Sequence, residues 1–277
     1  MYYRTVPTRA RGRGSGCSGR LLMAAAIAAF SLFSYFSSRQ DNPVTGETQY
    51  IDITPEQEIA LGLEAAPQMA AEFGGLDENA ADQALVDEIG NRIVQSSPAG
   101  RSPYEFDFHL LDDDQTINAF ALPGGQVFIT RALYDKLQTE GELAGVLGHE
   151  IGHVVGRHSA EHIAKAKLTE GLTGAAVIAA YDPNNPSSAS RAQIAVLIGQ
   201  LINLKFGRDD ELESDYLGVC FLNDSGYNPS ELVRVMEVLA SSRQGNQPPE
   251  FFSTHPNPEN RIQRIQQAVQ NVDSCPG

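Results

Sequence analysis

The sequence predicts an α+β fold that is mostly helical, with one small antiparallel sheet ahead of a long apolar helix. Apolar residues recur at helical spacing over several capped segments, and two short stretches between residues 106 and 130 have the composition of strands. The length of 277 residues, with 42% hydrophobic and 20% charged residues, fits one sizeable core. No internal repeat is visible, so we expect a single globular domain over residues 54–277.

The first 40 residues consist of a basic segment followed by an apolar one. Five arginines fall within residues 1–20, and the next 16 residues carry no charge, an order typical of an export signal. Because no small-x-small cleavage site follows Phe36, we expect residues 21–38 to remain as a signal anchor, with a cleaved signal peptide as the alternative. Cys17 precedes the apolar stretch, which argues against lipoprotein processing.

The charge distribution separates this N-terminal part from the rest of the chain. Six of the 20 Lys and Arg residues precede the first acidic residue, Asp41, so residues 41–277 hold 14 basic and 35 acidic residues, a formal charge of −21. Nucleic acid is therefore excluded as a partner, because its phosphates require clustered Lys and Arg. Residues 39–53 are expected to be a linker. The domain beyond it is expected on the periplasmic side of the inner membrane, or free in the periplasm if the signal is cleaved.

The elements before the long apolar helix are predicted from capping and turn residues. Thr54 with Gln57 caps the first helix, and Pro123-Gly124-Gly125 forms a turn between two strands. His109, a lone histidine in a strand, is expected to be structural. In order, the elements are helices over residues 54–73 and 80–94, a linker over 97–103, and strands over 106–111 and 126–130.

The long apolar helix begins with a capping box formed by Thr139 and Glu142. Further helices are expected over residues 230–240 and 258–272. Residues 171–207, which follow the long apolar helix and precede these two helices, hold two apolar stretches around a Pro- and Asn-rich turn, each too short to span a membrane. We expect a buried helical hairpin there, with a mobile lid or membrane-facing flap as the alternative.

Residues 149–153 of the apolar helix read His-Glu-Ile-Gly-His, an H-E-x-x-H motif. Two histidines four residues apart share one face of a helix, so His149 and His153 can bind one cation. Glu150 lies one step around the helix, at the rim of such a site, where it can act as a base. A catalytic zinc takes three protein ligands, so a third must come from another part of the chain.

The sequence Glu211-Leu212-Glu213-Ser214-Asp215 offers that third ligand. Glu211 and Asp215 share a helix face, so Glu211 can bind the metal while Asp215 holds the second ring nitrogen of a ligating histidine. Glu213 points to the opposite side and is the second candidate for the ligand. The plainer interpretation, a solvated acidic face, explains the composition but not its pairing with H-E-x-x-H.

With these motifs the chain resembles the M48 family of zinc metallopeptidases, from about Asn42 to Ile265. It resembles the short periplasmic or membrane-anchored type, without a tetratricopeptide repeat domain. Four segments occur in the order typical of that family: residues 118–125, residues 149–153, residues 211–215, and Thr254-His255-Pro256 followed by Arg261. The resemblance implies a gluzincin-like fold and one Zn²⁺ per chain, held by His149, His153 and Glu211. It also implies that Glu150 is the general base and that Asp215 contacts a ligating histidine without binding the metal itself.

Two further segments gain roles from this resemblance. An unpaired strand edge can bind an extended peptide through backbone hydrogen bonds, so Asn118, Ala119, Phe120 and Ala121 are expected to bind substrate. His255 is expected to stabilise the transition state or to act as a gate by occupying the open metal position.

The remaining histidines and cysteines carry weaker signals. If the apolar helix runs on, His158 and His162 are rotated to roughly the far side from the metal and serve packing or solvent contact. Cys220 and Cys275 either form a disulfide in an oxidising compartment or remain free thiols.

We therefore expect a zinc-dependent endopeptidase acting on exported polypeptides that are misfolded or unassembled. Two alternatives remain open. One is a metal-containing chaperone or assembly factor with a latent proteolytic site. The other is a structural metal site, which is disfavoured because such sites usually prefer cysteine.

Overall fold

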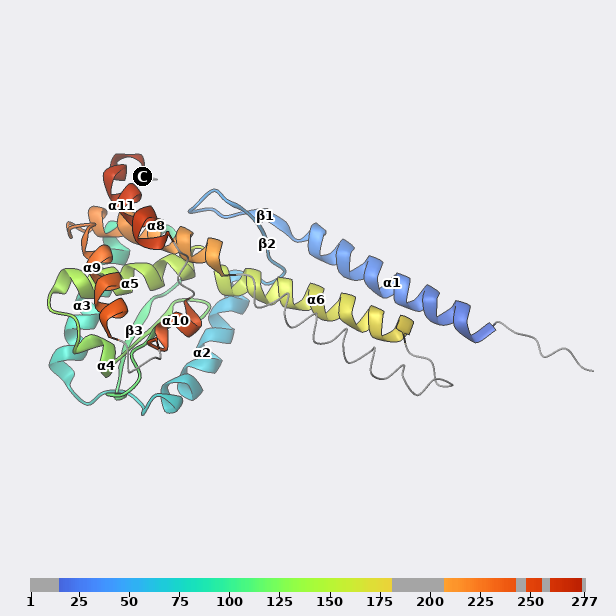
Figure 1. Cartoon of the computed structure of the whole chain (residues 1–277), viewed down its shortest axis with the longest axis horizontal. Helices are drawn as coiled ribbons and strands as arrows, with labels where there is room; N and C mark the ends of the chain where they lie inside the picture. Colours follow the sequence, from blue (N-terminus) through green and yellow to red (C-terminus); the bar gives the residue numbers. More distant parts are fainter. Residues whose placement is uncertain (1–14, 181–206, 243–247, 256–259, 276–277) are drawn as a thin grey trace, which may run out of the picture. The chain divides into compact units, whose positions relative to one another are not determined.

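The computed structural model describes residues 15–180, 207–242, 248–255 and 260–275 (Figure 1). The chain divides into two compact units, Met1–Ser34 with Ala166–Ile202, and Tyr35–Lys165 with Asn203–Gly277. Of the residues expected to form one domain over 54–277, the described residues 166–180 group with the N-terminal unit.

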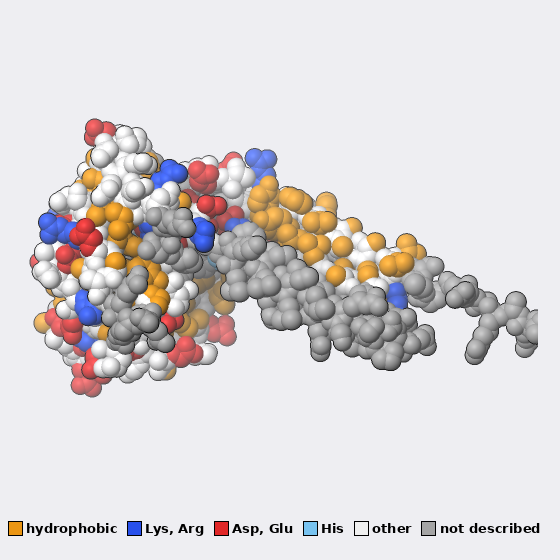
Figure 2. Space-filling model, viewed as in Figure 1, with side chains coloured by type: hydrophobic (Ala, Val, Ile, Leu, Met, Phe, Trp, Pro, Cys, Tyr) orange, Lys and Arg blue, Asp and Glu red, His pale blue; other side chains and the backbone are white. Residues whose placement is uncertain are grey.

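The first unit contains most of α1 (Ser15–Ser37) and the second part of α6 (His158–Ala180). By length and composition, Gly19–Ser37 is apolar enough to cross a membrane, and among the described residues it is the one helix that meets this test. Large apolar side chains such as Leu22, Phe30 and Phe33 are exposed on α1. Figure 2 shows hydrophobic side chains along the surface of this helix. The predicted apolar segment 21–38 is therefore helical up to Ser37. Of the predicted hairpin over 171–207, residues 181–206 lie outside the described residues.

The second unit begins with a short hairpin where the sequence predicted a linker. β1 (Arg39–Asp41) and β2 (Thr48–Tyr50) pair antiparallel. The side chain of Asn42 donates to the carbonyl of Val155 (2.8 Å), and that of Gln49 donates to the carbonyl of Gly156. These carbonyls lie at the C-terminal end of a helix, where backbone acceptors lack partners within the helix. The hairpin thus caps the helix that carries the H-E-x-x-H motif.

The predicted helices before the sheet are confirmed. α2 (Pro55–Glu72) begins with the expected capping box between Thr54 and Gln57, and α3 (Ala80–Ser96) follows. The linker after α3 forms a 3-10 turn, η1 (Pro98–Arg101). α4 (Arg131–Tyr134) is a single turn after the last strand.

A small three-stranded sheet precedes the long helix, as expected. It contains β3 (Asp107–Leu111), β4 (Ala119–Ala121) and β5 (Gln126–Thr130) in the order β3-β5-β4. β4 and β5 form the antiparallel pair, joined by the predicted turn, whereas β3 pairs with β5 in parallel. The parallel pair was not predicted, because residues 118–121 were expected only as a strand edge for substrate and were not placed in the strand pairing between 106–111 and 126–130. β4 gives the chain an extra reversal of direction before β5.

The two helices that carry the motifs pack closely together. α5 (Glu140–Val155) begins at Thr139, whose side chain accepts from the backbone N–H of Glu142 (3.1 Å). It crosses α8 (Arg208–Asp224) at a point where a Cβ added to Gly152 would lie 3.0 Å from the backbone oxygen of Ser214. Glycine at this position therefore allows the close approach that brings residue 211 next to residues 149 and 153.

A sharp turn ends α5. Arg157 has a φ of 58°, in the left-handed region that residues with a Cβ rarely adopt, and α6 begins at the next residue. The buried guanidinium of Arg157 offsets this strain, because it donates to Glu58, to Gln40 (3.2 Å) and to the carbonyl of Ile53 (3.1 Å). The helix that carries the H-E-x-x-H motif therefore ends two residues after it, and a new helix starts at His158.

Helices complete the C-terminal part. They are α9 (Glu231–Ser241), α10 (Phe251–Thr254) and α11 (Arg261–Gln270), followed by the 3-10 turn η2 (Val272–Ser274). Cys220 on α8 forms a disulfide with Cys275, with Cα atoms 5.6 Å apart. The disulfide interpretation of the two cysteines is thus confirmed, and the bond ties the C-terminal end to the helix that carries Glu211.

Candidate metal centre

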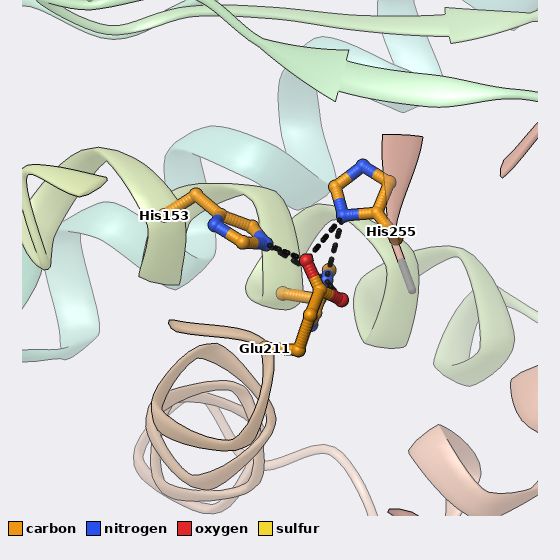
Figure 3. A group of neighbouring side chains, drawn as sticks. His153, Glu211 and His255 are labelled. Atoms are coloured by element: carbon orange, nitrogen blue, oxygen red, sulfur yellow. Dashed lines mark hydrogen bonds and ion pairs between the residues drawn. The ribbon is translucent and has the colours of Figure 1, made fainter. Parts of the chain in front are cut away.

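Four side chains from distant parts of the sequence meet between α5, α8 and α10. They are His149, His153, Glu211 and His255, and one ligand atom from each lies within 4.8 Å of the others. Figure 3 shows the side chains of His153 and His255 pointing toward Glu211. The Nε2 atoms of His149 and His153 are 3.1 Å apart, and Oε1 of Glu211 is 3.2 Å from Nε2 of His153. Nδ1 of His255 lies 3.0 Å from the same oxygen. All predicted ligands therefore converge on one point.

Their convergence follows from the helices that carry them. The two histidines are one turn apart on α5 and present the same face, and the close crossing of α5 and α8 brings Glu211 opposite them. Glu213, the second candidate for the ligand, lies outside the cluster and contacts His158. The structure thus favours Glu211 over Glu213 by position.

Asp215 lies behind His149, where the sequence analysis expected it. Its Oδ1 is 3.0 Å from Nδ1 of His149, so the ring presents Nε2 to the cluster. Arg261 holds the other side of Asp215, with Nε 2.7 Å from Oδ2 and Nη2 2.9 Å from Oδ1. Arg261 is only 1% exposed and also lies 3.0 Å from Glu211. The sequence marked it only as a basic residue behind the Thr-His-Pro segment, with no assigned partner.

The prediction for His158 was wrong. A continuous helix would carry this residue to the far side, but the turn at Arg157 starts a new helix and folds His158 back against the site. His158 is 3% exposed, and its Nδ1 lies 2.9 Å from Nδ1 of His153. His162, one turn further, pairs with Asp210 at a side chain that is 41% exposed, in agreement with the solvent contact expected for it. The strand residue His109 contacts Gln126 and stacks on Phe128, which confirms its structural role.

Burial and opposite charges set the protonation of the cluster. Burial raises the pKa of Glu150 and holds the pKa of His153 well below its usual value. Burial alone would lower the pKa of His149, but hydrogen bonds to Asp215 and Glu211 raise it to about 9. Burial acts against the charge of Glu211, yet its contacts with three histidines hold its pKa below the usual range. A buried carboxylate among imidazoles is an arrangement that a divalent cation stabilises.

The donor set fits a zinc ion. Two imidazoles and one carboxylate are ligands that zinc accepts, and they leave a fourth position open, as catalytic sites do. Within the described residues, neither carboxylate oxygen of Glu150 accepts a hydrogen bond, although both atoms are buried and Oε1 lies 3.5 Å from Nε2 of His255. Buried oxygens without hydrogen bonds are unfavourable unless a cation or a substrate satisfies them. If His255 also binds the metal, it fills the fourth coordination position and leaves none open for water or substrate.

The predicted substrate strand borders this cluster. β4 pairs with β5 on one side, and no described strand pairs with its other edge. The carbonyl of Ala119 on β4 lies 3.3 Å from Nε2 of His255. The side chain of Phe120 stacks on Phe128 in the core, and Asn118 is buried. Any contribution of this strand to substrate binding therefore comes from its backbone.

A helix with H-E-x-x-H, crossed by a second helix that supplies a glutamate, is the arrangement that defines gluzincin-like metallopeptidases, and the mostly helical fold with its small sheet agrees with that class. Within this class the chain belongs to peptidase family M48, because the family model described as "Peptidase family M48" matches residues 80–269. The match includes every residue of the cluster.

Curated relatives agree with the family. The chain is 33% identical over 226 residues to the "Beta-barrel assembly-enhancing protease" of Yersinia pestis, an alignment that covers 79% of this chain and 45% of the relative. The protein of the same name from Escherichia coli K12 is 31% identical over 188 residues, an alignment that covers 64% of this chain and 37% of the relative. The "Mitochondrial metalloendopeptidase OMA1" of Schizosaccharomyces pombe is 28% identical over 236 residues, covering 84% and 67%. The chain thus spans about half the length, or less, of these bacterial relatives.

Proposed function

We propose that this protein is a zinc-dependent endopeptidase that hydrolyses misfolded or unassembled exported proteins. The observation that carries the proposal is the convergence of His149, His153 and Glu211 beside the buried carboxylate of Glu150, whose two oxygens accept no hydrogen bond within the described residues. A site built only to bind a metal has no chemical need for that carboxylate.

Each residue has one task in this mechanism. His149, His153 and Glu211 would hold a zinc ion, which would act as a Lewis acid toward the attacking water and the scissile carbonyl. Glu150 takes the proton from the water during attack and gives it to the leaving amine, so its raised pKa suits a group that must both accept and release a proton. Asp215, held by Arg261, keeps His149 in the tautomer that presents Nε2.

The substrate class and location rest on the surroundings of the site. Backbone pairing with the free edge of β4 would accept many sequences, which suits an enzyme for misfolded chains. Helix α1 would tether the catalytic unit to the periplasmic side of the inner membrane as a signal anchor. Two of the relatives are named for enhancing β-barrel assembly, which supports a role in protein quality control of the cell envelope.

Proteolysis of a denatured protein tests the proposal. We expect the 277-residue chain, purified in detergent, to cleave unfolded casein, to lose that activity on treatment with a strong zinc chelator, and to regain it when Zn²⁺ is restored. Metal removal leaves Glu150 without the Lewis acid on which its chemistry depends. Binding of casein without cleavage at any metal concentration would instead support the chaperone or assembly factor.

His255 is proposed as a gate on this site. Its ring contacts Glu211 (3.0 Å), lies 3.5 Å from Glu150 and 3.3 Å from the carbonyl of Ala119. The His255 side chain therefore covers the open metal position and approaches the base, Glu150. It also contacts a backbone carbonyl to which an extended peptide would donate a hydrogen bond. In this position His255 would keep the enzyme latent.

If His255 is a gate, His255→Ala should raise kcat/KM for casein by about tenfold, equivalent to roughly 1.4 kcal/mol. Ser253→Ala, an exposed residue of the same short helix, is the matched control and should change nothing. Activity of His255→Ala equal to that of the control would rule out the gate. A fall in kcat would instead support the alternative role of His255 in stabilising the transition state.

A further inference from the structure

His153 uses both ring nitrogens, and they face different partners. Its Nε2 lies 3.2 Å from Glu211 and 3.1 Å from Nε2 of His149, toward the metal position. Its Nδ1 lies 2.9 Å from Nδ1 of His158. Two nitrogens at this distance share one proton, so the tautomer of one ring decides the tautomer of the other.

Glu213 decides which nitrogen of His158 carries the proton. Its Oε2 lies 3.2 Å from Nε2 of His158, and an ionised carboxylate only accepts hydrogen bonds. His158 therefore donates from Nε2 and leaves Nδ1 bare. That bare nitrogen accepts from Nδ1–H of His153, and the hydroxyl of Ser214, at 3.3 Å, can donate to the same atom. With its proton on Nδ1, His153 presents a bare Nε2 to the metal.

We propose that Glu213 and His158 form a positioning pair that fixes the tautomer and orientation of the metal ligand His153. This inference rests on the proposed zinc site and deepens it. It assigns a role to Glu213, the middle acid of residues 211–215, which acts on His153 through His158. The acids on either side act directly, because Glu211 faces the metal position and Asp215 contacts His149. Each of the three alternate acids thus supports the metal cluster.

The backbone leaves space for this arrangement. A Cβ added to Gly156 would lie 2.5 Å from Nε2 of His158, so a residue with a side chain there would displace the ring. The left-handed turn at Arg157 then aims the ring back toward α5. Both features serve the placement of His158, which is 3% exposed.

The same two helices supply a natural control. One turn further along α6, His162 pairs with Asp210 on α8 in the same way that His158 pairs with Glu213. Within the described residues, the contacts of His162 include none with a member of the metal cluster. Loss of His162 therefore removes a pair of the same chemistry without touching the ligands.

The test measures zinc affinity of the 277-residue chain in detergent by competition with a chromophoric chelator. We expect His158→Leu to weaken zinc binding by 10- to 100-fold, the range typical of lost outer partners of a ligating histidine. His158→Asn should keep most of the affinity, because Oδ1 of asparagine can take the place of Nδ1 as acceptor. Glu213→Ala should weaken binding by several-fold, and His162→Ala should leave it unchanged.

A spectroscopic measurement reads the tautomer directly. In the zinc-loaded protein, nitrogen NMR of the histidine rings should show His153 protonated at Nδ1. In Glu213→Ala, where nothing fixes the proton of His158, that signal should shift or broaden. A wild-type His153 protonated at Nε2 would overturn the proposal.

The outcomes separate this inference from the proposed function. If the wild type binds zinc and cleaves casein, while His158→Leu and Glu213→Ala bind zinc as His162→Ala does, the positioning pair is wrong and the peptidase stands. If the wild type binds no zinc, the proposed function itself fails. Should His158→Leu fail to fold, Glu213→Ala decides the matter, because the Glu213 side chain is 25% exposed and its loss perturbs the core little.

Discussion

Glu150→Gln should abolish peptide hydrolysis while zinc remains bound. General acid and base catalysis contributes roughly 10²- to 10⁴-fold, and an amide of the same shape cannot accept the proton, so kcat should fall by at least that range. The side chain is fully buried and lies beside the cluster without belonging to it. Its replacement should therefore leave the three metal ligands in place.

Two measurements are needed to interpret that variant. Zinc content must equal that of the wild type, which separates loss of the base from loss of the metal. Glu140→Gln, an exposed residue at the start of the same helix, controls for removal of a negative charge from α5 and should keep full activity. Turnover by Glu150→Gln close to that of Glu140→Gln would show that another group is the base.

The sequence was sufficient to predict those parts of the candidate cluster that obey local rules. Helical spacing places His149 and His153 on one face whatever surrounds them, and the same spacing relates Glu211 to Asp215. The helices and their caps at Thr54 and Thr139 are also local features, and the structure has them where they were predicted.

Features that depend on one unusual backbone residue or on distant pairing were not predictable in the same way. His158 was misplaced because nothing in the sequence marks Arg157 as left-handed, and its φ of 58° is stabilised by Glu58, 99 residues earlier. The glycine before Arg157 was the available signal for the end of the helix. The parallel pairing of β3 with β5 likewise depends on the three-residue strand β4, which is too short to show a pattern.

Arg261 illustrates the same limit and leads to the second large effect, on stability. This arginine is 1% exposed and joins α11 to α8. Its guanidinium donates two hydrogen bonds to Asp215 and also contacts Glu211. Removing one partner of such a buried pair leaves uncompensated carboxylates, so Arg261→Leu should lower the free energy of unfolding by about 3–5 kcal/mol. Burial raises the pKa of a carboxylate, but Arg261 is the main group that holds the pKa of Asp215 below its usual value.

The stability of Arg261→Leu is best measured by urea unfolding in the presence of chelator, so that any loss of zinc does not enter the comparison. Arg264→Leu, an exposed position one turn along the same helix, should change the free energy of unfolding by no more than about 0.5 kcal/mol. Arg261→Lys keeps the charge but lacks the planar fork, so an intermediate loss would assign part of the effect to geometry. If Arg261→Leu unfolds at the same urea concentration as Arg264→Leu, the pair with Asp215 does not stabilise the fold. The role of Arg261 would then be confined to orienting His149 through Asp215, which zinc affinity would still report.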